Sequence, residues 1–240
     1  VGAPSSFNLL ENRDDQRVLV ENSITTDDRV TIVDGAGVDG AAFPAQPLPP
    51  RDAPNEPLKI ALVARMLWSK GIDLAVDAVS QARAQGANVT LSLVGAPDPL
   101  NPQAVTEAQL RQWATQDGIE WLGRREDILR VWQDHDVALL PSRGGEGLPR
   151  SLIEAAACAR PIITTDVPGC REIVIDGETG CLVNAEDVGA LANTIITLTS
   201  KSQAELAAMA TASRAHFETR FTEKAVTEKV VGLYQEAFTW

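Results

Sequence analysis

Residues 141–182 read PSRGGEGLPRSLIEAAACARPIITTDVPGCREIVIDGETGCL, and this stretch predicts the class of the fold. The apolar residues 137–140 before it predict a strand, a glycine-rich loop follows, and Pro149 stands where the first position of a helix is expected. A strand, a loop and a helix N-terminus in this order are typical of the ligand-binding edge of an α/β sheet. Free backbone N–H groups and the positive end of the helix dipole converge there, so the stretch predicts an anion site.

Two glutamates flank this predicted anion site. Glu146 lies in the loop, and Glu154 lies on the helix among small and apolar neighbours that imply partial burial. Glutamate is frequent in first helical turns because it favours the dipole, so Glu146 alone would mean little. A buried carboxylate is costly unless it is hydrogen-bonded, and hydroxyl groups can donate to it. Together with Gly144, Gly145 and Gly147, which permit close approach of the backbone, the pair predicts a nucleotide sugar as ligand.

A second pair of candidate residues is basic. Arg65 and Lys70 follow the strand predicted at residues 59–63 and precede the next helix, which again places them at the ligand edge of the sheet. An arginine can bind a phosphate with two hydrogen bonds, and a lysine adds a mobile point charge. The alternative interpretation is a basic loop that is simply solvated.

The rest of the chain predicts an α/β fold with a parallel sheet and helices on both faces, because short apolar runs alternate with helical patterns from residue 57 onward. The strands are expected at residues 59–63, 89–94, 119–122, 137–140 and 161–164, with a short one near 181–183. The helices are expected near residues 72–85, 102–115, 128–133 and 149–158, and three more near 187–198, 203–217 and 223–238.

The first fifty residues do not fit this alternation. A strand is expected at residues 29–33, and prolines crowd residues 44–57, which forbids a helix there and indicates a linker. We therefore expect a boundary near residue 50, with residues 51–240 forming the main domain. Residues 1–50 are too few to build a core of their own and are interpreted as the end of another domain and its linker.

Composition excludes several classes of protein. The net charge of −12 argues against a nucleic-acid binder, which neutralises many phosphates with Lys and Arg. The three cysteines, Cys158, Cys170 and Cys181, favour structural thiols in a reduced compartment. No run approaches the roughly 18 apolar residues of a membrane helix, and the first residues lack the pattern of a signal peptide. We expect a cytoplasmic protein.

Two further motifs are weighed and rejected. Gly35, Gly37 and Gly40 spell the dinucleotide-binding pattern, but the prolines that follow leave no helix to receive a pyrophosphate. Asp134 and Asp136 form a D-x-D triplet that could hold a divalent cation, although an acidic residue at the entrance of a strand is ordinary. No phosphate-binding P-loop motif occurs, and two histidines make a zinc site remote.

Taken together, ARMLWSKGID, IEWLGRREDI, EGLPRSLIEAAAC and TDVPGCRE closely resemble the C-terminal half of group 1 glycosyltransferases, also called family-four glycosyltransferases. The resemblance covers roughly residues 50–240 and is greatest to bacterial enzymes of capsule, O-antigen or exopolysaccharide assembly. The leading residues resemble the end of the N-terminal domain of that family and its hinge. The implied architecture is a GT-B fold, in which two Rossmann-like domains face a cleft.

The resemblance assigns a role to each candidate residue. Arg65 and Lys70 match the positions that hold the donor diphosphate, Glu154 matches the one that binds the ribose hydroxyls, and Glu146 the one that contacts the transferred sugar. The remaining donor-binding positions are backbone or base contacts: Gly145, Gly147 and Leu148 near the sugar and phosphates, and Gly123, Arg124 and Arg125 around the nucleobase.

The implied activity is the transfer of a sugar, with retention of configuration and without metal or cofactor, from a UDP-sugar to a glycan or lipid-linked acceptor. A GDP-sugar donor is the nearer alternative, a binding module without catalysis is the rival from another class, and a GT-B-like epimerase is disfavoured. The acceptor site of such enzymes belongs mainly to the N-terminal domain, so we expect this chain to bind donor but not to transfer sugar efficiently. Contact with a membrane surface is an expectation for the full-length parent.

Overall fold

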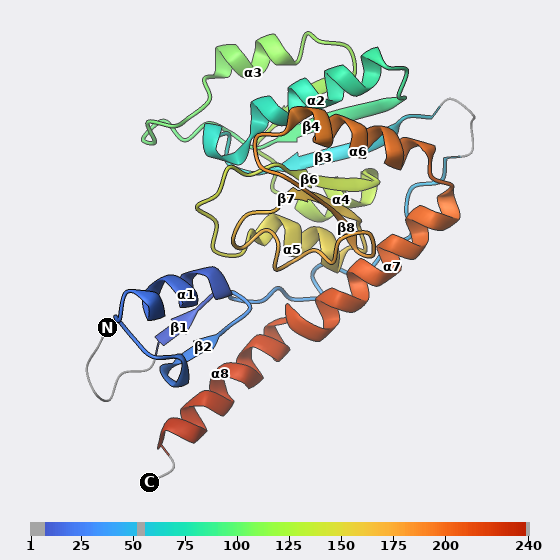
Figure 1. Cartoon of the computed structure of the whole chain (residues 1–240). Helices are drawn as coiled ribbons and strands as arrows, with labels where there is room; N and C mark the ends of the chain where they lie inside the picture. Colours follow the sequence, from blue (N-terminus) through green and yellow to red (C-terminus); the bar gives the residue numbers. More distant parts are fainter. Residues whose placement is uncertain (1–7, 52–55, 239–240) are drawn as a thin grey trace.

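The computed structural model describes residues 8–51 and 56–238, and its main body is a six-stranded parallel sheet (Figure 1). The sheet runs in the order β5-β4-β3-β6-β7-β8, and every neighbouring pair is parallel. Its strands are β3 (Leu58–Val63), β4 (Val89–Val94), β5 (Ile119–Gly123), β6 (Val137–Leu140), β7 (Ile162–Thr165) and β8 (Gly180–Val183). The predicted fold class is confirmed.

Helices cover both faces of this sheet. On one face, α2 (Ile72–Ala84) and α6 (Val188–Ser200) pack against side chains such as Ile60 and Leu62. On the other face, α4 (Ile128–Asp134) and α5 (Arg150–Ala157) pack against Ala61 and Leu140. The central strands are apolar on both sides because neither face meets water, which is typical of parallel sheets.

Two predicted helix starts are wrong. The helix expected from residue 102 is α3 (Glu107–Trp113), which begins later because the Thr106 side chain caps it by accepting from the backbone N–H of Gln109 at 3.2 Å. Pro149 is the residue before α5 rather than its first turn, since its ψ of 106° is extended. The other helices and strands for which the sequence predicts a range lie within a few residues of it.

The strand order reverses between β3 and β6, the two central strands from which the chain proceeds outward in opposite directions. Loops that leave the carboxyl ends of these strands diverge to opposite faces of the sheet and open a crevice between them. The glycine-rich loop follows β6, and the segment that carries Arg65 and Lys70 follows β3. The two predicted halves of the ligand site therefore meet at this point.

The N-terminal residues form a separate small unit below the main sheet (Figure 1). Strands β1 (Asn8–Leu10) and β2 (Val30–Ile32) pair in parallel, with α1 (Arg13–Glu21) between them. No described residue between β2 and β3 is helical, in keeping with the prolines of residues 44–57. The division of the chain at residue 50 stays a prediction.

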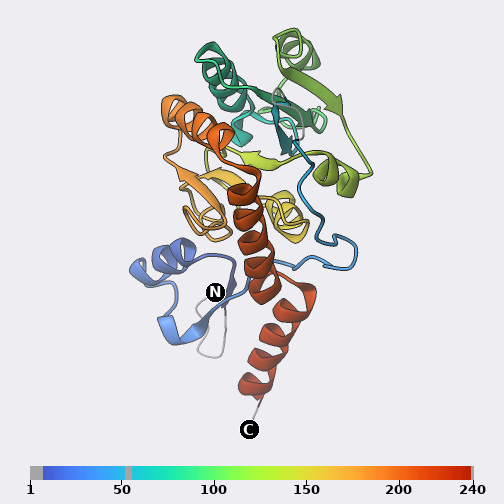
Figure 2. The same cartoon turned by 90° about the vertical axis from the view of Figure 1, so that its right-hand side faces the viewer.

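The end of the chain returns to the N-terminal unit. After α7 (Gln203–Arg220) the chain continues as α8 (Glu223–Phe238), which extends beyond the main body toward the side where the N-terminal unit lies (Figure 2). Val38 packs in the same apolar cluster as Phe217 and Phe221. No described helix is both long enough and apolar enough to cross a membrane.

Candidate active site

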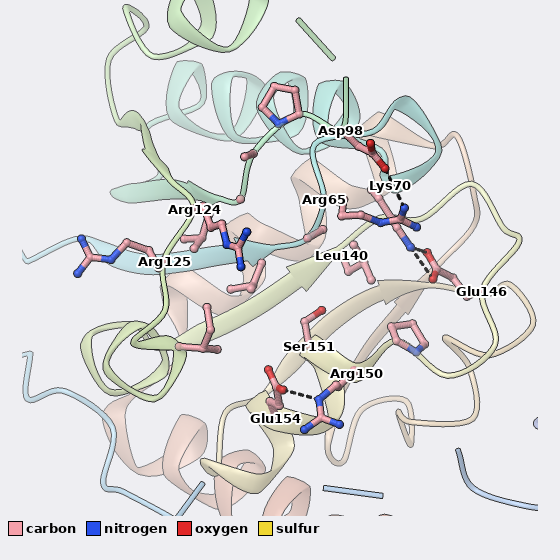
Figure 3. A pocket seen from close by; sticks show the side chains of 18 of the residues that line it. Arg65, Lys70, Asp98, Arg124, Arg125, Leu140, Glu146, Arg150, Ser151 and Glu154 are labelled. Atoms are coloured by element: carbon pink, nitrogen blue, oxygen red, sulfur yellow. Dashed lines mark hydrogen bonds and ion pairs between the residues drawn. The ribbon is translucent and has the colours of Figure 1, made fainter. Parts of the chain in front are cut away.

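A cavity of about 630 Å³ opens at the carboxyl ends of β3, β4, β5 and β6, beside the N-terminal turn of α5 (Figure 3). Its charged lining residues come from four separate loops and one helix. They are Arg65, Lys70, Asp98, Arg124, Arg125, Glu146, Arg150 and Glu154. The wall carries both cations and carboxylates, so the cavity suits a ligand that combines negative charge with hydrogen-bond donors.

The two residues expected to serve phosphate and sugar are bonded to each other. Lys70 Nζ donates to both carboxylate oxygens of Glu146, at 2.6 and 2.7 Å. The Lys70 side chain is 17% exposed and that of Glu146 is 7% exposed, so this is a nearly buried ion pair. The Ser142 hydroxyl also donates to Glu146, at 2.8 Å. Lys70 is therefore not part of a merely solvated basic loop.

The other cations of the cavity are more open to solvent. Arg65 pairs with Asp98 at 3.3 Å, and its side chain is 63% exposed. Arg125 makes two hydrogen bonds with Asp127, at 2.9 and 2.8 Å. Arg124 is exposed and has no hydrogen bond or ion pair with any residue that the structure describes. Its guanidinium is thus available to a ligand.

Glu154 is nearly buried, as its apolar neighbours predict. Its side chain is 12% exposed and accepts a hydrogen bond from Arg150 Nε, one helical turn earlier, at 2.9 Å. Burial raises the pKa of Glu154, and the bond from Arg150 opposes that shift. The carboxylate faces the cavity (Figure 3), where it can accept hydrogen bonds from a hydroxylated ligand.

Glycines of the loop have a left-handed conformation or lie close to neighbouring atoms. Gly145 has a φ of 71°, a left-handed conformation that favours glycine. A Cβ on Gly147 would lie 1.8 Å from Glu11 Oε2, so the small N-terminal unit touches the loop directly. Gly169, in the turn after β7, has a φ of 81°, and a Cβ there would lie 1.7 Å from the Gly147 carbonyl oxygen. The loop is consequently held from two sides.

The structure brings most of the predicted site residues together. Arg65, Lys70, Arg124, Arg125, Glu146, Leu148 and Glu154 all line the cavity, whereas Gly123, Gly145 and Gly147 lie in the adjoining backbone and not in its wall. The sequence reasoning missed Asp98, Ser142 and Arg150. Only Arg150 left a readable signal, because a residue four positions before Glu154 shares its helix face.

The D-x-D triplet lies away from this cavity. Asp136 precedes β6 at the opposite edge of the sheet, and its Oδ2 accepts from the backbone N–H of Lys59 at 2.8 Å. Asp134 pairs with Arg130 at 2.9 Å. Within the described residues, no cluster of three or more His, Cys, Asp or Glu side chains is arranged to hold a metal ion.

The three cysteines are free thiols, in line with their expected structural role. Cys158 and Cys170 are fully buried, and burial raises the pKa of each thiol to about 12. Such thiols stay protonated and unreactive at neutral pH.

The strand order and the position of the charged cavity define a Rossmann-like α/β domain of the kind that binds phosphate-containing ligands at its switch point. The chain belongs to the family "Glycosyl transferases group 1", whose model matches residues 57–201. The resemblance noted from the motifs is thereby confirmed.

Several relatives are named for the synthesis of bacterial polysaccharides. WcaL of Escherichia coli (strain K12), named for colanic acid biosynthesis, is 30% identical over 207 residues, which is 83% of this chain and 49% of WcaL. The amylovoran biosynthesis glycosyltransferase AmsK of Erwinia amylovora is 29% identical over 180 residues, 72% of this chain and 43% of AmsK. The chain thus spans about half the length of the curated relatives it matches.

Solved structures share the fold. HepE from Anabaena, crystallised with UDP, superimposes with a TM-score of 0.81 at 20% identity, covering 96% of this chain and 64% of HepE. A glycosyltransferase from Rickettsia africae gives a TM-score of 0.81 at 19% identity, covering 98% of this chain and 64% of its own. The main sheet of this chain and its helices accordingly match a Rossmann-like part of GT-B glycosyltransferase structures.

Proposed function

We propose that this chain is the donor-binding half of a retaining glycosyltransferase that takes a UDP-sugar and acts in cell-surface polysaccharide synthesis. The observation that carries the proposal is the cavity at the switch point. Lys70, Glu146 and Glu154 all line this cavity, beside the N-terminus of α5. Family membership, the polysaccharide enzymes among the relatives, and a structural neighbour solved with UDP-glucose support it.

The donor's parts fit different residues of the cavity. The diphosphate binds Arg65, Lys70 and the free N–H groups at the start of α5, which together supply charge-assisted hydrogen bonds. The ribose hydroxyls bind Glu154, and Arg124 frames the base together with the neighbouring Gly123 and Arg125. Gly145, Gly147 and Leu148 bring the backbone close to the sugar and the phosphates.

The chemistry follows from where charge develops. The leaving group is a nucleoside diphosphate, and the cations that already bind it in the ground state stabilise the negative charge that grows as the glycosidic bond breaks. Glu146 orients hydroxyls of the transferred sugar and favours an oxocarbenium-like state. Attack by an acceptor hydroxyl from the same face gives retention. In this proposal the local cations do the work that a metal would otherwise do, and no cofactor is needed.

The acceptor is a glycan or a lipid-linked saccharide, bound mainly by a further N-terminal domain of the kind that makes up the rest of the longer relatives. This chain by itself binds donor and transfers sugar poorly. The proposal places the reaction in the cytoplasm, with the full-length parent at a membrane surface and with no nucleic-acid partner.

Titration calorimetry tests the donor site. We expect UDP to bind the chain more tightly than GDP and NAD not to bind. The variant Lys70→Met should weaken UDP binding by roughly 10- to 100-fold, because a charge-assisted hydrogen bond contributes about 1.5 to 3 kcal/mol. Lys224→Met is the matched control, because Lys224 is 84% exposed on α8 and touches no part of the cavity.

The outcomes separate the competing functions. Tighter binding of GDP than of UDP would favour the GDP-sugar alternative. Binding of UDP with no sugar transfer by the full-length parent would favour a module without catalysis. If neither nucleotide binds and Glu154→Ala changes nothing, the donor-site assignment is wrong.

A further inference from the structure

Lys70 and Glu146 are 76 positions apart in the sequence, so other contacts must hold their two segments next to each other. Lys70 ends a short 3-10 turn, η2 (Trp68–Lys70), after β3. Glu146 lies in the glycine-rich loop after β6. A lysine has a long, flexible side chain, so a fixed position of its ammonium group requires that its backbone be fixed as well.

Arg143, at the start of the glycine-rich loop, joins these segments. Its Nη1 and Nη2 donate to the two carboxylate oxygens of Asp73, each at 2.8 Å, and Nη1 also donates to the carbonyl oxygen of Trp68 at 2.5 Å. Its Nε donates to Glu186 at 2.8 Å, and its backbone N–H donates to the carbonyl oxygen of Ser69 at 2.9 Å. Arg143 thus contacts both residues that immediately precede Lys70.

The geometry of these contacts is specific to arginine. A planar guanidinium can bind a carboxylate with two parallel bonds and still donate to a third and a fourth group, which an ammonium group cannot do from one fixed position. The Arg143 and Asp73 side chains are each 25% exposed, so water competes only in part. The hydrogen bonds to Asp73 raise the pKa of Arg143 above its ordinary value, because they stabilise the charged guanidinium.

Arg143 does not act on a ligand directly. It is absent from the wall of the cavity, and four of its five guanidinium N–H groups donate to Asp73, Trp68 and Glu186. Asp73 belongs to the first turn of α2, which is the helix that follows Lys70 through Gly71. The contact therefore clamps the loop that carries Glu146 to the first turn of α2, the helix that begins two residues after Lys70.

We propose that Arg143 is a positioning residue of the donor site, which clamps the glycine-rich loop to η2 and the first turn of α2 and so presents Lys70 to the donor diphosphate. This inference rests on the proposed function. Without the clamp, η2 and the loop can separate, and the Lys70 ammonium group samples positions away from the cavity. The fold itself keeps its two apolar clusters, so the main loss is in ligand binding.

A double-mutant cycle with UDP as the probe tests the inference. Arg143→Met should weaken UDP binding roughly 10-fold or more, as expected for a misplaced binding group. In the Lys70→Met background the same substitution should have little further effect, because the group that it positions is already gone. Arg143→Lys keeps the positive charge but cannot make the two parallel bonds to Asp73, so it should recover only part of the UDP affinity.

Controls separate positioning from general stability. Asp73→Asn removes the other half of the clamp and should reproduce the loss of UDP affinity, including its disappearance in the Lys70→Met background; it also serves if Arg143→Met does not fold. Arg130→Met removes an exposed ion pair with Asp134 on α4 and should bind UDP like the unaltered chain.

Two results would overturn the inference alone. The first is an unchanged UDP affinity in both Arg143→Met and Asp73→Asn. The second is that each of these substitutions lowers UDP affinity by the same factor in the Lys70→Met background as in the unaltered chain. Failure of the unaltered chain to bind either UDP or GDP would instead reject the proposed function, and the positioning role with it.

Discussion

At the scale of single residues, Glu154 is a site residue whose burial disfavours the folded state. Its carboxylate is nearly buried, and among residues 8–51 and 56–238 its one hydrogen-bond partner is the largely exposed Arg150. A charged group in such a place is usually retained for what it binds, because burial of charge without full compensation disfavours the folded state. Hydroxyls of a ligand would complete its hydrogen bonds.

Glu154→Gln should therefore make the chain more stable at pH 7. Because the pKa of Glu154 is raised in the folded state, the folded chain binds this proton more tightly than the unfolded chain does. Stability then falls as pH rises from the ordinary pKa of 4.5 through the raised value, and glutamine removes that fall. The thermal midpoint of the variant should exceed that of the unaltered chain at pH 7 and converge with it below pH 4.5.

Glu107→Gln is the matched control for this measurement. Glu107 also pairs with an arginine four positions away, at 2.8 Å, but its side chain is 61% exposed. Its substitution should leave the thermal midpoint nearly unchanged across the same pH range. A Glu154→Gln variant that is less stable at pH 7 would show that the bond from Arg150 outweighs burial.

At the scale of elements, the glycine-rich loop depends on a neighbouring turn. Gly169 lies against the backbone of the loop, and any Cβ there would approach the carbonyl oxygens of Gly147 and Glu146 at 1.7 and 2.9 Å. The turn and the loop therefore have to move together. This close approach of two backbones explains the glycine of the motif TDVPGCRE.

Gly169→Ala should destabilise the chain by more than the strain of its φ alone. A left-handed alanine costs roughly 1–2 kcal/mol, and the contact with Gly147 adds about 1–3 kcal/mol of overpacking. Gly177→Ala is the control, because Gly177 has a similar φ of 76° and no atom within 4 Å of its would-be Cβ. Urea unfolding followed by tryptophan fluorescence measures both, and equal losses would contradict the expectation.

The elements also show where sequence patterns were sufficient. Strands β3 to β8 were predicted within a residue or two, because each is a short apolar run between turn residues. The start of α3 was not, because proline and asparagine at residues 99–102 fit either a first turn or a loop. Capping by the Thr106 side chain decides between them.

At the scale of the whole molecule, Asp34 connects the N-terminal unit to the end of the chain. Its carboxylate pairs with Arg220 at 2.5 Å and with Lys229 at 3.0 Å, and its side chain is 7% exposed. Both partners come from the last two helices. This contact and the packing of Val38 against Phe221 hold α8 beside the residues that follow β2.

Asp34→Asn should loosen α8 while the main sheet stays folded. The loss of two ion pairs at a nearly buried carboxylate should make trypsin cleave after Lys224 or Lys229 roughly tenfold faster. Glu218→Gln is the control, because it removes an exposed i,i+4 pair with Arg214 on α7 and leaves Asp34 intact. Mass spectrometry of the digests measures the rate of cleavage. The same rate in both variants would show that Asp34 does not hold α8.

The sequence by itself determined the α/β class, the position of most elements and the identity of the charged candidates, because these follow from local periodicity and local motifs. Only the tertiary structure decided which charges meet. Lys70 bonds Glu146 across 76 positions, and Arg143 bonds Asp73 across 70. Such pairs depend on how β3 and β6 come to lie side by side at the centre of the sheet, and strand order is a property of the whole chain that no local pattern encodes.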